Sequence, residues 1–228
     1  FDNYIEALDP GRYYFLAADI AEFEGYRYEL DNALRRGDLL PAYRMFNRLQ
    51  KRLLERTTYM QRAIDSGLKR LDFTTDEVIR IKREKVAWSI DQATQDDLWN
   101  RRLKSQVLSM KLNNKELEEI AETLAKRYRN QQKVALRNRS EDAFQPFINA
   151  FAATFDPHTQ YFSPRTSTNF NINMSLSLEG IGAVLQSDED ATKIVRLVPA
   201  GPADKSGALK PSDIISAVGQ GDAGPMID

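Results

Sequence analysis

Apolar residues recur every three to four positions through most of the first 160 residues, which is the spacing of helices with one buried face. The pattern first stops at the turn-forming run Asp9-Pro10-Gly11. Asp19 is placed to cap a second helix, which Gly37 would end. A longer helix is expected from about Asp38, with Pro41 in its first turn. We expect the three apolar faces to pack as a bundle; they are Phe1, Tyr4, Ile5 and Leu8, then Phe23, Tyr26, Leu30 and Leu34, then Phe46, Leu49, Leu53, Met60 and Ile64.

The stretch from residue 70 to residue 114 contains one ambiguous segment and one clear helix. The pair Thr74-Thr75 is a helix-start signal, but the segment Val78–Trp88 also fits a strand, and both alternatives stay open. The clear helix ends at the turn Asn113-Asn114. Trp88 and Trp99 are expected to be core anchors, because Trp99 shares one helical face with Leu103, Val107 and Met110.

Two more helices are expected before residue 160. The first begins near Lys115 and the second near Ser140. Pro146 is awkward inside the second helix, because an interior proline loses a hydrogen bond and clashes one turn back. That helix therefore either starts later or bends at the proline. Both helices have a face typical of a core, namely Leu117, Ile120, Leu124 and Tyr128, then Phe144, Phe147, Ile148, Phe151 and Phe155.

A basic run follows the first of these faces. Nucleic-acid binding would require aromatic or polar base readers beside the cations, and only Tyr128 is near. The charges also spread around the helix instead of forming one stripe. A solvated or protein-docking face is therefore the preferred interpretation, and no nucleic-acid partner is expected; the cations are Lys126, Arg127, Arg129, Lys133, Arg137 and Arg139.

The period changes to two at residue 174, where apolar and serine residues alternate up to Leu178, as in a strand with one buried face. The run Gly180-Ile181-Gly182 follows, and the residues Ala183, Val184 and Leu185 continue as a second strand. Further along, a strand is expected over Lys193–Val198, a short helix from about Pro199 to Ser206-Gly207, and a strand at Ile214-Ile215.

The glycine loop is the candidate binding site. Gly180 and Gly182 permit a tight turn in which backbone N–H groups converge, forming a nest for an anion such as a terminal carboxylate. The strand Ala183–Leu185 would accept an extended peptide along its free edge. We therefore expect the peptide-binding residues to be Gly180, Ile181, Gly182, Ala183, Val184 and Leu185. The alternative is that the loop is only a turn between two strands.

The order of glycine loop, two strands, short helix, turn and strand is that of a PDZ domain. The run Ser175 to Gln186, with Gly201-Pro202-Ala203 and Leu209 to Asp213, resembles the PDZ segment of the C-terminal processing peptidases, also called tail-specific proteases. Three other stretches resemble the regions that precede the PDZ domain in that family: Leu8-Asp9-Pro10 with Tyr14-Phe15-Leu16 and Asp19, Asp156 to Tyr161, and Ser163-Pro164. The resemblance spans nearly the whole chain.

This resemblance implies a serine endopeptidase that recognises the non-polar C-terminal tails of its substrates and works in the periplasm. It also implies a catalytic serine and a general-base lysine downstream of the PDZ domain, so this chain has no catalytic residue and should be inactive by itself. Some members of the family are brought to substrates by a helical-repeat lipoprotein adaptor, which would bind the helical domain here. The alternative function is a non-catalytic PDZ adaptor with a helical docking arm.

Composition excludes several other classes of protein. The 228 residues are 42% hydrophobic and 29% charged, as in ordinary globular proteins, and 32 Lys and Arg nearly cancel 33 Asp and Glu. Without cysteine there is no disulfide, thiolate metal site or cysteine nucleophile. The single histidine, His158, lies in a turn-forming run, where a structural or hydrogen-bonding role is expected. No cofactor, metal or direct membrane span is expected.

These observations predict an α+β fold with a mainly helical N-terminal domain and a truncated PDZ-like β module. The expected boundaries are residues 1–165 for the helical domain, 166–173 for a polar linker and 174–228 for the partial PDZ domain, with its carboxylate-binding loop and first strands.

Overall fold

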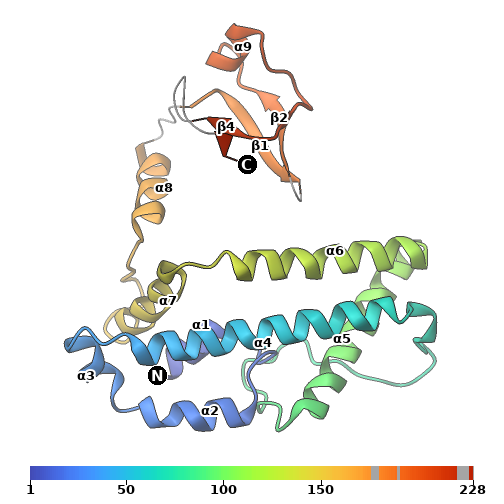
Figure 1. Cartoon of the computed structure of the whole chain (residues 1–228), viewed down its shortest axis with the longest axis vertical. Helices are drawn as coiled ribbons and strands as arrows, with labels where there is room; N and C mark the ends of the chain where they lie inside the picture. The colour runs from blue at the N-terminus through green and yellow to red at the C-terminus, as the bar shows by residue number, and fades with distance from the viewer. Residues whose placement is uncertain (176–179, 189–190, 220–225, 228) are drawn as a thin grey trace. The chain divides into compact units, whose positions relative to one another are not determined.

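A computed structural model describes residues 1–175, 180–188, 191–219 and 226–227 (Figure 1). The chain divides into two compact units, Phe1–Ser163 and Pro164–Asp228. The first unit is helical and the second contains the strands, so the predicted α+β class is confirmed. No helix in the described ranges is both long and apolar enough to cross a bilayer.

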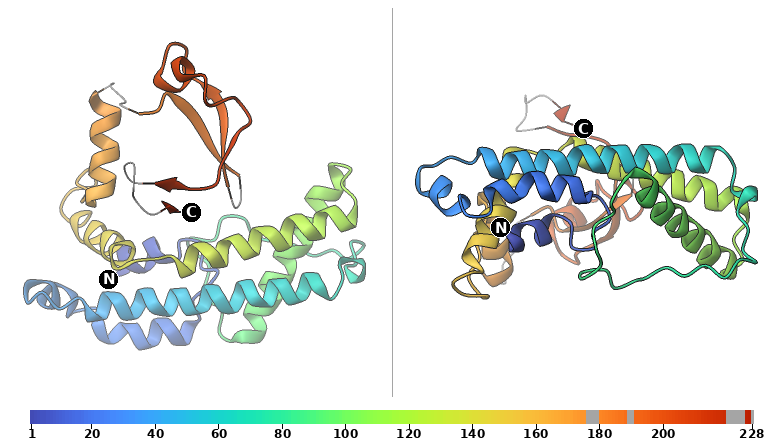
Figure 2. Two further views of the ribbon diagram at one scale, coloured as in Figure 1. Left: turned by 45° about the horizontal axis from the view of Figure 1, so that its top comes forward. Right: turned by 90° about the horizontal axis from the view of Figure 1, so that it is seen from below.

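The helical unit is a bundle arranged along one long helix, α4, which lies side by side with α6 (Figures 1 and 2). Helices α1 and α7 pack on each other and on α4, and α5 packs on α4 and α6. The α-helices of this unit are α1 (Asp2–Leu8), α2 (Ala17–Phe23), α3 (Leu30–Arg35), α4 (Leu40–Asp65), α5 (Gln92–Leu112), α6 (Leu117–Leu136) and α7 (Ser140–Ala152), with short 3-10 turns η1 (Glu24–Tyr26) and η2 (Leu68–Arg70).

Two apolar clusters form the core of the bundle. One joins α1, α2 and α7 to the first half of α4, and it includes Phe15, Met45 and Phe147. The other joins α5 and α6 to the second half of α4 around Trp99, whose side chain is fully buried. The predicted core role of Trp99 is therefore confirmed, and Trp88 packs partly buried against the first cluster.

The prediction of one continuous helix between Asp19 and Gly37 is wrong. The segment is divided into α2, η1 and α3, and Gly25 lies at the break. The predicted capping role of Asp19 is confirmed, but from the third position of α2: its side chain accepts a hydrogen bond from the N–H of the N-cap residue Leu16 at 2.9 Å. The end of the segment is as expected, because Gly37 has a positive φ of 71° after α3.

Residues 71–91 form neither the helix nor the strand that the sequence left open. The segment is held instead by side chains and backbone groups near the N-terminus. Arg83 Nε donates to the carbonyl of Gly11 at 3.1 Å, and Arg12 donates to the carbonyl of Val86 at 2.6 Å. The bridge between Leu16 and Ser89 then leads into α5. Its conformation thus depends on contacts with residues more than 70 positions away.

Helix α7 starts at Ser140 and continues through Pro146, so the proline does not delay the start of the helix. The expectation that its aromatic face is core is only partly correct. Phe147 is buried, and the ring of Phe144 contacts that of Tyr161 edge-on. Phe151 is 37% exposed, and Phe155, which lies beyond the end of the helix, is 77% exposed.

The turn after α7 contains the single histidine. The carboxylate of Asp156 accepts hydrogen bonds from the backbone N–H of His158 at 3.0 Å and from the hydroxyl of Thr159 at 2.8 Å. These bonds hold the turn and involve only the backbone of the histidine. Across the described residues, no cluster of three or more potential metal ligands occurs.

The second unit begins with α8 (Pro164–Ser175), so the residues 166–173 of the expected polar linker are helical. Met174 and Ser175 belong to α8 and not to a strand, and residues 176–179 of that expected strand lie outside the described ranges. The remaining elements are β1 (Ala183–Asp188), β2 (Ala191–Leu197), α9 (Pro202–Ser206), β3 (Ile214–Ile215), β4 (Val218–Gly219) and β5 (Met226–Ile227).

The strands form an antiparallel sheet in the order β1-β2-β3 and a separate antiparallel pair of β4 with β5. Ile194 in β2 is fully buried, and Ala203 in α9 is also buried. The predicted strand at 193–198 and the strand at 214–215 are confirmed within two residues, and the short helix is confirmed with a start at Pro202, three residues later than expected.

Candidate peptide-binding site

The predicted binding residues are contiguous in the structure. Gly180, Ile181 and Gly182 form a bend that leads directly into β1, and Ala183, Val184 and Leu185 are the first three residues of that strand. Gly182 has a φ of 74°, a left-handed conformation that costs a residue with a side chain about 1–2 kcal/mol. The second glycine of the loop is therefore required by the backbone.

Two backbone hydrogen bonds hold the loop against the rest of the β module. The N–H of Val198 donates to the carbonyl of Gly182 at 2.7 Å, and the N–H of Ala203 donates to the carbonyl of Ile181 at 2.8 Å. A trans peptide places its C=O and N–H on opposite sides. The N–H groups of Gly182 and Ala183 are consequently directed away from α9 and β2, toward the open side of the loop.

The loop also lies unusually close to the start of α9. A Cβ added to Gly182 would lie 3.0 Å from Cδ of Pro202 and 3.2 Å from Cα of Gly201. A Cβ added to Gly201 would lie 2.9 Å from the carbonyl oxygen of Val198. The two glycines thus let two backbone segments come into contact, whereas Gly180 has no such neighbour within 4 Å.

Strand β1 lies at an edge of its sheet. It pairs with β2 on one side, and no described strand pairs with its other side. The register shifts between Val184 and Leu185, where a bulge increases the local twist. Ile181 and Leu185 expose 48% and 44% of their surface, so apolar side chains flank the open edge. An extended peptide could pair with this edge through its backbone.

The residues that fix the loop were not among those predicted for the site. Val198, Gly201, Pro202 and Ala203 follow β2 and set the direction of the loop carbonyls. The only signal in the sequence was the Gly-Pro pair before a short helix, which marks a helix start but not a contact with a loop 20 residues earlier.

The neighbouring pair Lys205 and Ser206 has no catalytic arrangement. Both residues lie in α9, and the Ser206 hydroxyl donates to the carbonyl of Ala203 at 2.9 Å, the usual bond of a serine inside a helix. Lys205 is exposed to solvent and does not accept the proton of the Ser206 hydroxyl, which is bonded to Ala203 instead. The two neighbouring side chains therefore do not form a serine–lysine pair.

Comparison with known proteins agrees with this organisation. Residues 1–165 match the family described as the tail-specific protease N-terminal domain. The chain is also 41% identical over 221 residues to the tail-specific protease of Haemophilus influenzae, an alignment that covers 96% of this chain and 31% of that protein. The chain thus spans less than a third of the length of this relative. The chain therefore belongs to the tail-specific protease family.

Proposed function

We propose that this chain is the N-terminal helical and substrate-recognising portion of a periplasmic serine endopeptidase, and that its β module binds the non-polar C-terminal tails of substrate proteins. Membership of the tail-specific protease family supports the protease part of the proposal. The observation that carries the recognition part is the loop at Gly182, where the carbonyls of Ile181 and Gly182 accept hydrogen bonds from Ala203 and Val198. In a trans peptide the N–H group lies opposite the carbonyl, so the next N–H groups would be available to a ligand.

In this proposal the N–H groups of Gly182 and Ala183 bind the terminal carboxylate of the ligand. The ligand backbone then pairs with the free edge of β1, and an apolar side chain lies near Ile181 and Leu185. The carboxylate sets the register of the ligand and the strand sets its direction. In PDZ domains a later helix completes the side-chain pocket, so the contacts described here would supply only part of the affinity, and we expect weak binding from them.

The chemistry of the whole protein is proposed from the family resemblance. A serine nucleophile and a lysine general base would lie in the part of the protein beyond this sequence. The helical unit would bind a partner, for which the candidate is a helical-repeat lipoprotein adaptor. We therefore expect no peptidase activity from this chain by itself. A binding test of residues 1–163 against such an adaptor checks the partner proposal, and loss of all binding in that test would assign the contact to another part of the protein.

The recognition proposal is tested by a site-resolved titration. Amide shifts of the 228-residue chain are followed by NMR while an apolar pentapeptide with a free carboxylate is added, and again with its C-terminal amide. We expect weak, carboxylate-dependent shifts at residues 180–185. Gly182→Ala should abolish them, because its Cβ would meet Pro202 and its φ is positive. Gly25→Ala is the matched control and should bind like the parent chain, since Gly25 lies in the helical unit and nothing lies within 4 Å of its Cβ position.

Equal shifts with acid and amide, or normal binding by Gly182→Ala, would refute the carboxylate loop. A second experiment separates the protease from a non-catalytic adaptor. The longer natural protein is incubated with a test protein that ends in an apolar tail and with the same protein ending in a charged tail. Preferential cleavage of the first is expected, and binding without cleavage would favour the adaptor function.

A further inference from the structure

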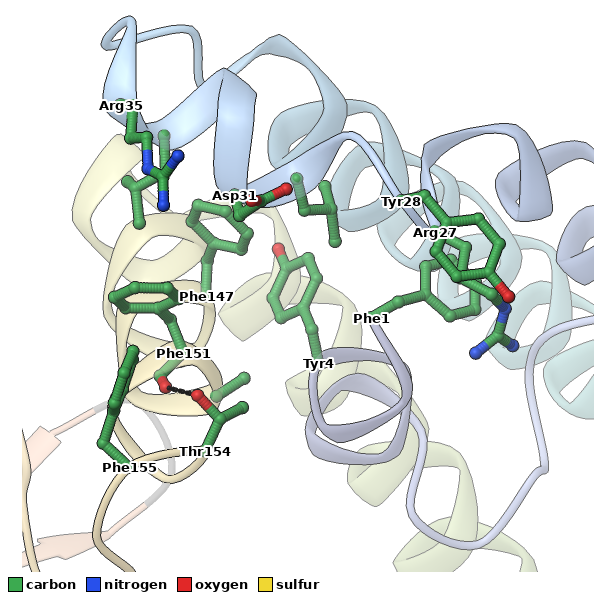
Figure 3. Close-up of a pocket in the computed structure, with 13 residues that line it drawn as sticks. Phe1, Tyr4, Arg27, Tyr28, Asp31, Arg35, Phe147, Phe151, Thr154 and Phe155 are labelled. Atoms are coloured by element: carbon green, nitrogen blue, oxygen red, sulfur yellow. Dashed lines mark hydrogen bonds between the residues drawn. The ribbon is translucent and has the colours of Figure 1, made fainter.

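The helical unit contains a pocket of about 770 Å³ that is separate from the carboxylate loop (Figure 3). Residues of α1, α3 and α7, with the segments that adjoin them, line this pocket. Its volume lies within the range of roughly 300–1,000 Å³ that is typical of sites for small ligands. The loop at Gly182 belongs to the other unit, so the two sites are built independently.

The interior of the pocket is apolar. Tyr4 and Phe147 lie in it, with their rings packed edge-on at 5.2 Å, and Leu30 and Leu34 line it from α3. The hydroxyl of Tyr4 already donates to the carbonyl of Ala42 at 3.1 Å. The one polar group on these four side chains is therefore satisfied, and the surface left for a ligand is hydrocarbon.

Large aromatic side chains at the pocket remain exposed. Tyr28 exposes 85% of its surface, Phe155 77% and Phe151 37%, although each of them lines the pocket. The rings of Phe151 and Phe155 contact each other edge-on at 5.2 Å, so they present a continuous aromatic wall (Figure 3). An exposed apolar patch around a concavity is typical of a binding site.

Two arginines line the same pocket, and only one is available to a ligand. Arg27 is bound by the carboxylates of Asp2 and Glu24 at 2.6 Å each. Arg35 has no ion pair or side-chain hydrogen bond among the described residues, and its guanidinium points from α3 toward the aromatic rings of α7 (Figure 3). Asp31 lies one turn before Arg35 on α3, and it likewise has no such partner in the described part of the chain.

This combination specifies the chemistry of the ligand. One unpaired guanidinium beside a hydrocarbon surface fits a molecule with a single carboxylate and an apolar body. A fatty acid would meet those two requirements but would offer nothing to the Asp31 carboxylate, which accepts hydrogen bonds. A peptide supplies N–H donors in addition to the carboxylate and the apolar side chains.

We infer that this pocket is a second binding site, for a short apolar peptide that ends in a free carboxylate. The carboxylate pairs with Arg35, apolar side chains lie between Tyr4 and the aromatic wall of Phe151 and Phe155, and Asp31 accepts from the peptide backbone. The inference goes beyond the proposed function and does not depend on the loop at Gly182.

The test uses the 228-residue chain and three probes: an apolar acetylated pentapeptide with a free carboxylate, its C-terminal amide, and decanoate. Calorimetry gives the affinity and NMR shifts give the location. Arg35→Gln should weaken binding of the acid about tenfold, to the level of the amide, since a charge-assisted bond is lost. Arg36→Gln is the matched control, because Arg36 is the adjacent exposed arginine and does not line the pocket.

Shifts on α3 and α7 that are reduced by Arg35→Gln but unchanged by Arg36→Gln or Gly182→Ala would support the second site. Four outcomes would overturn it: no binding at millimolar peptide, equal affinity for acid and amide, affinity for decanoate as high as for the peptide, or shifts confined to residues 180–185. The last outcome would leave the proposed function of the β module intact, so the two proposals fail separately. Phe155→Ala gives an independent readout, because it truncates an exposed ring and should weaken binding without unfolding the chain.

Discussion

Replacing Asp19 with asparagine should destabilise the helical unit strongly. Its side chain is only 1% exposed and connects α2 to α4. It accepts from the N–H of Leu16 at 2.9 Å, from Nε and Nη2 of Arg52 at 2.8 and 2.9 Å, and from the guanidinium of Arg48. Asparagine keeps the shape of the side chain but removes its charge and one acceptor oxygen.

The expected loss in the free energy of unfolding is about 3 kcal/mol. Removing one partner of a buried ion pair typically costs about 3–5 kcal/mol, because the other charge is left without compensation. Here the two arginines remain 27% and 17% exposed, so water can partly solvate them after the substitution. This solvent access places the estimate at the lower end of the range.

The effect should depend on pH. Burial tends to raise the pKa of Asp19, but hydrogen bonds from Arg52, Leu16 and Arg48 together outweigh it, so the pKa is lowered below its usual value of 3.8. A carboxyl group whose pKa is lower in the folded than in the unfolded state stabilises the fold above its unfolded pKa. That contribution is lost as the pH falls through the folded pKa. The difference between the parent chain and Asp19→Asn should therefore be full near neutral pH and should shrink below pH of about 4.

Urea unfolding followed by tryptophan fluorescence measures this difference for the helical unit alone. Both tryptophans, Trp88 and Trp99, belong to the helical unit, so their emission reports its unfolding and not that of the β module. Glu22→Gln is the control, because it removes the 2.7 Å pair with Arg48 while Glu22 is 56% exposed. It should cost less than about 1 kcal/mol. A loss below about 1 kcal/mol for Asp19→Asn at pH 7, or an equal loss at pH 3 and pH 7, would refute the reasoning.

Three further substitutions test the packing and ends of the helices. Trp99→Ala removes a fully buried ring and the hydrogen bond from its Nε1 to the carbonyl of Tyr13 at 2.9 Å. We expect the free energy of unfolding to fall by about 3–5 kcal/mol in urea unfolding monitored by circular dichroism. A fall of less than about 1 kcal/mol would contradict the core assignment. Asp91→Ala removes the cap of α5, where the carboxylate accepts from the N–H of Thr94 at 2.8 Å, and should cost about 1 kcal/mol, whereas Asp91→Asn should cost less. Pro146→Ala should stabilise α7 by up to about 3 kcal/mol, because it restores a backbone hydrogen-bond donor inside the helix. An unchanged urea midpoint would contradict this prediction and would mean that the fold already compensates for the proline.

The long helices were predictable because each has its own periodic pattern. The helices α4, α5 and α6 are 26, 21 and 20 residues long, and buried residues such as Met60, Trp99 and Ile120 are among those that the spacing selects. A long pattern distinguishes the helical period of about 3.6 residues from the strand period of about 2. The break between α2 and α3 was missed because four apolar residues at helical spacing bridge Gly25, and periodicity alone does not register the weak helix propensity at that position.

Exposure at the end of α7 could not be deduced from the chain. Phe147 and Phe155 have the same residue type and continue the same face, yet one is buried against Tyr4 and the other is 77% exposed. Burial depends on whether a second element covers that turn of the helix, and this is a property of the assembled bundle. The conformation of residues 71–91 could not be deduced for the same reason, because distant residues such as Arg12 supply hydrogen bonds to this segment.

For the candidate site, the sequence alone determined the chemistry: two glycines before a strand, with residue types that permit a left-handed turn and a free edge. The order of the elements indicates a PDZ domain, and the residue motifs along the chain resemble those of the tail-specific proteases. Tertiary structure decided which way the loop amides are directed, because hydrogen bonds from Val198 and Ala203 orient the carbonyls at Ile181 and Gly182. Only folding brings Arg35 to the same pocket as the aromatic wall of α7, since residues more than 100 positions apart meet there. Residue type and local spacing determine local conformation, whereas direction, exposure and convergence are set by the packing of one segment against another.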